Sequence, residues 1–138
     1  MEKNAIISVK SFSDIDPNDA IEVLTPGTFI IEEKYFKAIY EESELSGMEG
    51  TTTTLIIKED TMILERVGST NTNMKFKEGE IAISLYNTPY GMLDLNIDTK
   101  ALSINIDENG GKIYVKYILG LEGQEGITTE LVVKINAN

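Results

Sequence analysis

The chain has 138 residues, enough for one domain whose core needs neither a metal nor a disulfide to fold. It contains no cysteine and no histidine, which excludes disulfides, thiol nucleophiles and zinc–thiolate sites and removes the commonest general base and transition-metal ligand. Its net charge of −11 argues against nucleic acid or an anionic membrane as a partner, because both attract basic surfaces. We therefore expect a single domain over residues 1–138, with no cofactor and no metal.

The N-terminal segment predicts a strand over 4–12, and residues 1–10 contain no apolar leader. No apolar run approaches the ~20 residues that cross a bilayer, so we expect a cytoplasmic protein. The next segment, 14–18, carries acidic oxygens at alternate positions, like the start of a calcium loop. Asp19 stands where that loop needs glycine, and Thr25 stands where it needs glutamate. We expect a solvated acidic turn here.

Residues 16–25 admit two interpretations. Asp16-Pro17 is typical of a helix start, and Pro26-Gly27 would then end the helix. In the competing interpretation a strand covers 20–33, with Pro26-Gly27 as a bend or bulge. The alternation within 20–25 is itself ambiguous, and we favour the strand.

Further along the chain, hydropathy changes at every second residue, which is typical of strands with one apolar and one polar face. The apolar series are Ile81, Ile83, Leu85; Leu93, Leu95, Ile97; Leu102, Ile104, Ile106; Ile113, Val115, Tyr117, Leu119; and Leu131, Val133, Ile135. Short turn sequences such as Glu78-Gly79 separate them, so neighbouring strands must be antiparallel. The predicted strands are 4–12, 20–33, 35–42, 51–58, 61–67, 73–77, 80–88, 92–98, 101–107, 112–121 and 127–136.

Many short strands predict either a sandwich or a barrel. A sheet of about ten strands with one apolar face must curl or split to cover that face. Hairpin connections close most readily into a barrel, which also removes exposed edges. We therefore expect an all-β protein, a closed antiparallel up-and-down β-barrel of about 8–10 strands.

A series of local sequences runs along most of the chain in a distinctive order. They are YFKAIYEE at 35–42, a threonine-rich stretch at 50–58, Arg66-Val67-Gly68, Met74-Lys75-Phe76, YNTPYG at 86–91 and Asp98-Thr99-Lys100. Together they resemble the YwiB-like family, small bacterial proteins of unknown function, over about residues 4–136. The resemblance implies a lipocalin-like (calycin) barrel and an extended chain over 20–25. It implies no activity, substrate or catalytic residue.

Arg66 is the only arginine of the chain, and it shares a strand face with Met62 and Leu64. If that face lines the barrel, the guanidinium needs a partner. It would then anchor the anionic head group of a ligand, or form a structural ion pair for which Glu42 is the candidate. The remaining alternative is exposure on the outer face.

The other candidates are a carboxylate and four tyrosines. Glu42 shares a strand face with Tyr40, whereas Glu41 points the opposite way, so the two glutamates do not form a catalytic pair on one substrate. Tyr86 and Tyr90 flank a turn at Pro89, where they would either bind a ligand at the barrel mouth or cover the barrel end. The predicted ligand-binding residues are Arg66, Tyr40, Glu42, Tyr86, Tyr90 and Tyr117.

The sequence does not identify the function. The leading hypothesis is a non-enzymatic barrel that binds a small amphipathic or anionic molecule. The alternative is a protein–protein interaction or structural module with a solid core, including a homodimer. An enzyme using carboxylate, tyrosine or lysine chemistry has the least support, because no catalytic motif occurs.

Overall fold

The computed structural model describes residues 1–13, 21–43, 49–69, 71–88, 91–121 and 126–137. Its strands are β1 (Glu2–Ser13), β2 (Ile21–Ile31), β3 (Phe36–Glu41), β4 (Thr52–Ile57), β5 (Met62–Val67), β6 (Thr72–Phe76), β7 (Ile81–Thr88), β8 (Gly91–Asp107), β9 (Gly110–Leu121) and β10 (Ile127–Ala137). Strand β2 confirms the extended interpretation of 21–25, whereas the acidic turn at 14–18 lies outside the described residues. Over the same ranges, no helix has the length and hydropathy needed to cross a membrane.

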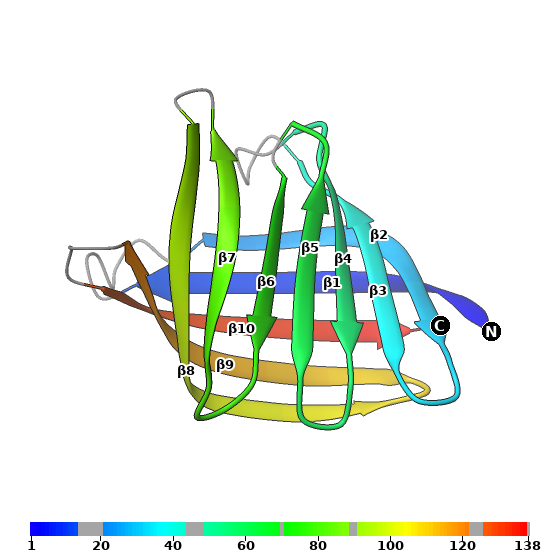
Figure 1. Cartoon of the computed structure of the whole chain (residues 1–138). Coiled ribbons are helices and arrows are strands. Elements are labelled where there is room, and N and C mark those ends of the chain that lie inside the picture. The colour runs from blue at the N-terminus through cyan, green and yellow to red at the C-terminus, as the bar shows by residue number, and fades with distance from the viewer. Residues whose placement is uncertain (14–20, 44–48, 70, 89–90, 122–125, 138) are drawn as a thin grey trace.

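All ten strands form one antiparallel sheet in the order β6-β5-β4-β3-β2-β1-β10-β9-β8-β7. Every strand pairs with its neighbours along the chain except at the β6–β7 connection, and β1 pairs with β10, so that Ile7 lies opposite Ile135. The sheet curls until β3 to β6 run across β1, β2, β9 and β10 (Figure 1). The predicted antiparallel up-and-down barrel is therefore confirmed.

The barrel is nearly closed, and its seam lies between β6 and β7, the two end strands of the sheet. The Glu80 amide donates to the Lys77 carbonyl at 3.0 Å, so Phe76 and Ile81 stand one residue to either side of this turn. Phe76 is fully buried, whereas Ile81 is 67% exposed. Residues that pair in an antiparallel ladder face the same side of the sheet. Because Phe76 faces the interior and Ile81 faces outward, β6 and β7 form no ladder across the seam. The Ser84 hydroxyl instead donates to the Asn73 carbonyl oxygen.

The orientation of β7 corrects one expectation from the sequence. We expected the apolar series to face the barrel interior, but Ile83 and Leu85 are 71% and 56% exposed. The buried Ser84 occupies the inner face instead. Pairing with β8 fixes this orientation, because Ser84 lies opposite Leu95.

Strand β8 corrects a second expectation. Segments 92–98 and 101–107, predicted as two strands, form one strand of 17 residues. Ile97 and Leu102 have opposite parity and could not both face inward on a regular strand. The register shifts between Thr99 and Ala101 as β8 pairs with β9, and this bulge restores the inward orientation.

The core lies where the inner faces of the curled sheet meet. Its largest fully buried side chains are Phe29, Phe76, Ile7, Leu55, Ile57, Met62, Ile97, Ile113, Val115 and Val133. The ring of Phe29 stacks on that of Phe36, with centroids 5.5 Å apart. Gly27 lets β2 approach β3 closely, because a Cβ there would lie 2.5 Å from the Ile39 carbonyl oxygen.

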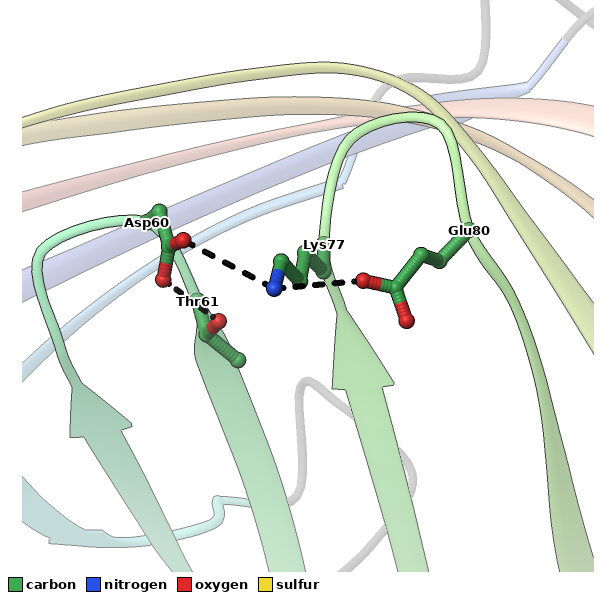
Figure 2. Close-up of polar contacts among 4 residues, drawn as sticks. All are labelled: Asp60, Thr61, Lys77 and Glu80. Atoms are coloured by element: carbon green, nitrogen blue, oxygen red, sulfur yellow. Dashed lines mark hydrogen bonds and ion pairs between the residues drawn. The ribbon is translucent and has the colours of Figure 1, made fainter.

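Polar contacts join the turns at one end of the barrel. The Lys77 ammonium lies 3.7 Å from Asp60 and 3.3 Å from Glu80, which links the β4–β5 and β6–β7 turns (Figure 2). The hydrogen bond to Glu80 and the nearby Asp60 charge raise the pKa of Lys77. The β6–β7 turn also docks on the β8 bulge, where the Gly79 amide donates to the Thr99 carbonyl at 3.0 Å. These contacts connect the turns at one end of the barrel. The candidate site lies toward the opposite end of the barrel.

Candidate functional site

A cavity of about 190 Å³ lies inside the barrel, toward the end where β1, β3 and β5 finish. Its apolar lining is Val9, Val23, Leu64, Met74, Phe76 and Leu131, and its polar lining is Ser11, Tyr40, Glu42, Arg66 and Tyr117. The cavity therefore combines an apolar body with a small group of polar side chains, which is the usual composition of a small-molecule site.

Strand alternation explains why these polar side chains face inward. Tyr40 continues the inner face of Ala38 on β3, and Arg66 continues that of Leu64 on β5. The register places Tyr40 opposite Thr53 and Thr53 opposite Arg66, so the three residues form one row across β3, β4 and β5. Because neighbouring strands lie about 4.8 Å apart, the ends of this row are roughly 10 Å apart at the backbone. Long side chains can span that separation inside the cavity.

Glu42 is a buried carboxylate whose hydrogen bonds come from its neighbours. It is 8% exposed, and it accepts a 2.7 Å hydrogen bond from the Thr53 hydroxyl. The Tyr40 phenol also interacts with the Glu42 carboxylate. Burial of the phenol and the Glu42 charge raise the pKa of Tyr40 well above its usual value, while Arg66 opposes the shift. Tyr40 therefore stays protonated near neutral pH.

Arg66 lines the cavity with a side chain that is only partly buried. Its Nε is buried and has no hydrogen-bond partner among the residues described. Within those ranges, no carboxylate oxygen comes close enough for an ion pair with it; the ion pairs formed there belong to Lys77 and Lys100. The structural ion pair with Glu42 is therefore not formed among the residues described, and that carboxylate accepts a hydrogen bond from Thr53. Arg66 continues the inner face of β5 after Leu64, and it also borders the open surface beside Leu85.

Tyr117 closes another side of the cavity. It is 8% exposed, and its ring centroid lies 4.9 Å from that of Phe76. Burial raises the pKa of Tyr117, whereas the Arg66 charge and a hydrogen bond with Thr129 lower it. With both phenols less acidic than usual, neither is suited to act as a general base near neutral pH.

The structure brings four of the predicted residues together, namely Tyr40, Glu42, Arg66 and Tyr117. Tyr90 and the side chain of Tyr86 lie outside the described residues. Thr53 was missed because it lies in a run of four threonines, which reads as an ordinary strand. Alternate residues of a strand share a face, so Thr53 could have been placed on the inner face with Leu55 and Ile57.

The comparisons with known proteins give a family but no activity. Residues 7–133 match the model of a domain of unknown function, DUF1934. The chain belongs to the DUF1934 family. It is 29% identical over 113 residues to the uncharacterized beta-barrel protein YwiB of Bacillus subtilis (strain 168), a match that covers 80% of this chain and 78% of the relative.

The DUF1934 fold is also seen in a solved structure. The crystal structure of the ywiB protein from Bacillus subtilis matches with a TM-score of 0.86 at 22% identity, covering 99% of this chain and 93% of that one. The resemblance to the YwiB-like family is therefore confirmed. The family description assigns no function to its members.

Proposed function

We propose that this barrel is a non-enzymatic binding protein for a small molecule that carries a carboxylate on a compact apolar body. The observation that carries the proposal is the buried Arg66 Nε, which has no acceptor within the part of the chain that the structure describes. A buried donor left unpaired costs about 1–3 kcal/mol. A carboxylate bound in the cavity would offset that cost by accepting two parallel hydrogen bonds from the guanidinium.

The size and lining of the cavity define the rest of the ligand. The cavity measures about 190 Å³, and Leu64, Met74 and Phe76 supply part of its apolar lining. An apolar cavity of about 150 Å³ in another protein holds benzene. A ligand body the size of a single ring or a short alkyl chain therefore fits, with its carboxylate directed to Arg66.

Glu42 does not compete with the ligand carboxylate for Arg66. Its carboxylate accepts a hydrogen bond from Thr53, and the Arg66 Nε has no partner among the described residues, which leaves that donor available to a ligand. Its negative charge still lies at the same cavity, so it disfavours ligands with several negative charges. We therefore expect monocarboxylates to bind better than dicarboxylates.

The experiment compares benzoate, hexanoate and the neutral benzamide by calorimetry and by NMR chemical-shift mapping. We expect benzoate and hexanoate to bind with dissociation constants of about a millimolar or below, and benzamide to bind at least about tenfold more weakly. The variant Arg66→Met should lose the preference for the charged ligand. Lys75→Met, which removes an exposed cation from the neighbouring strand β6, is the matched control and should retain it.

Two results would overturn the proposal: equal binding of benzoate and benzamide, or carboxylate binding that survives Arg66→Met unchanged. Shifts that map to surface lysines, and not to the residues around Leu64 and Phe76, would count equally against it. A cytoplasmic location and the exclusion of nucleic acid and membranes as partners stay predictions from the sequence.

A further inference from the structure

Arg66 faces two separate spaces. Among the described residues it alone lines both the barrel cavity and a second, open pocket beside the seam, which we call the seam pocket. The seam pocket is lined by Glu65, Arg66, Val67, Asn71, Thr72, Asn73 and Leu85. A ligand whose carboxylate binds Arg66 from the cavity therefore has its polar end next to the seam pocket.

Thr72 is the neighbour of Arg66 on the next strand. The ladder places Thr72 directly opposite Arg66, and Thr72 shares the inner face of β6 with Met74 and Phe76. Residues opposite each other in an antiparallel pair have Cβ atoms about 4.5–5.5 Å apart. The Thr72 Oγ1 is buried and, like the Arg66 Nε, has no hydrogen-bond partner among the residues described. Arg66 and Thr72, which we call the seam pair, thus bring two unpartnered polar atoms together.

The other polar side chains of the seam pocket have partners. The Asn71 Oδ1 accepts a hydrogen bond from the Gly68 amide at 3.2 Å, and its Nδ2 donates to the Gly68 carbonyl at 3.3 Å. The Asn73 Nδ2 donates to the Glu65 carboxylate at 3.4 Å. A ligand can therefore hydrogen-bond to the seam pair without displacing any of these contacts.

We propose that the ligand is an α-hydroxy acid, with its carboxylate on Arg66 and its α-hydroxyl on Thr72. The inference rests on the proposed function, in which the apolar body fills the cavity. Thr72 lines the seam pocket and not the cavity, so the group that reaches it extends from the carboxylate end of the ligand. The closeness of the seam pair requires that the two ligand groups stand on adjacent carbons.

The chemistry of the seam pocket favours a neutral hydroxyl at this position. A threonine hydroxyl both donates and accepts hydrogen bonds, so it pairs readily with another hydroxyl. An ammonium beside Thr72 would lie next to the Arg66 guanidinium, and a second carboxylate would share the seam pocket with Glu65. Like charges disfavour one another, so the hydroxyl is the substituent that neither residue opposes.

The experiment uses acids that differ in one substituent: hexanoate, α-hydroxyhexanoate, α-aminohexanoate and butylmalonate. By calorimetry, the better-bound enantiomer of α-hydroxyhexanoate should bind about threefold to tenfold more tightly than hexanoate. The amino acid and the dicarboxylate should bind more weakly than α-hydroxyhexanoate.

Substitutions at Thr72 test which residue produces the difference. Thr72→Val should abolish the preference for the hydroxy acid and leave hexanoate binding unchanged, whereas Thr72→Ser keeps the hydroxyl and should retain the preference. Thr54→Val is the matched control, because Thr54 is also half-buried but faces outward on β4, between the buried Thr53 and Leu55. It should bind both acids as the unmodified chain does.

The outcomes separate this inference from the proposed function. Hexanoate binding that depends on Arg66 but gains nothing from the α-hydroxyl would overturn the inference alone. If neither acid binds, both proposals fail. Equal weakening of the two acids by Thr72→Val would mean that Thr72 does not read the hydroxyl, and a preference for α-aminohexanoate would contradict the neutral substituent.

NMR chemical shifts give a second readout that does not depend on a variant. Replacing hexanoate by α-hydroxyhexanoate should add shifts at the amides of Thr72, Asn73 and Leu85, which border the seam pocket. The shifts around Leu64 should stay as they are with hexanoate, because the apolar body is the same. Additional shifts confined to the cavity lining would overturn the placement of the hydroxyl.

Discussion

The hydrogen bond between Thr53 and Glu42 is 2.7 Å long and buried at the polar end of the lumen. Thr53→Val keeps the shape of the side chain but removes the donor from a carboxylate that is 8% exposed. We expect the free energy of unfolding to fall by about 1–3 kcal/mol, measured by urea denaturation. The control Thr52→Val changes an exposed neighbour and should stay within about 0.5 kcal/mol. Equal effects of the two substitutions would refute the role given to Thr53.

Tyr40 and Tyr117 make stability depend on alkaline pH, because burial raises both phenol pKa values. Above about pH 10 the unfolded phenols lose protons that the native phenols keep, so the unfolded state binds fewer protons and stability falls as pH rises. Each buried phenol contributes a slope of up to about 1.4 kcal/mol per pH unit. Tyr40→Phe should flatten the decline between pH 10 and 11, measured by denaturant unfolding. An unchanged slope would show that Tyr40 titrates normally.

Strand β2 depends on Gly27 where it approaches β3. A Cβ at this position would lie 2.5 Å from the Ile39 carbonyl oxygen and 2.6 Å from the Ile7 side chain. We expect Gly27→Ala to lower the free energy of unfolding by about 1–3 kcal/mol, because a backbone carbonyl cannot move aside as a flexible side chain can. Gly120→Ala is the control, since the nearest atom would be 3.9 Å away, and it should be tolerated. Thermal denaturation of both variants would decide the matter.

The strands could be predicted from the sequence more reliably than their orientation could. Alternation identifies a strand and its two faces, but it does not say which face is inner. For β7 the apolar face lies outside, because pairing with β8 sets its orientation. In the same way, the sequence predicts separate strands over 92–98 and 101–107, whereas the chain continues as one strand through a bulge between Thr99 and Ala101. Both differences arise from neighbouring strands, which local patterns do not contain.

At the scale of the whole molecule, closure of the sheet creates the candidate site. Tyr40 and Arg66 come from β3 and β5, whereas Tyr117 comes from β9, on the opposite side of the strand order. The sequence predicted these residues as individual candidates, since each is polar on an otherwise apolar face. It could not predict that Glu42 would accept a hydrogen bond from Thr53 while the Arg66 Nε has no partner among the described residues, because both depend on the register between strands.

The sheet does not close completely, because β6 and β7 are not paired. We expect the barrel to open first at this seam. Strands β6 and β7 share no ladder, whereas β1 and β10 are paired from Ala5 to Ser13 near the middle of the strand order. Separating the seam therefore breaks fewer hydrogen bonds than any opening at β1. We expect amide protons of β6 and β7 to exchange at least about tenfold faster than those of β1 and β10, measured by NMR hydrogen exchange.

Ser84 provides the means to test this difference, because its hydroxyl donates across the seam to the Asn73 carbonyl oxygen. Ser84→Ala removes that hydrogen bond from a buried position and should accelerate exchange along β6 and β7 further. Exchange in β1 and β10 should change only by the accompanying loss of global stability, measured separately by denaturant unfolding. If all four strands exchange at one common rate before and after the substitution, the barrel opens only by complete unfolding, and the seam has no separate role.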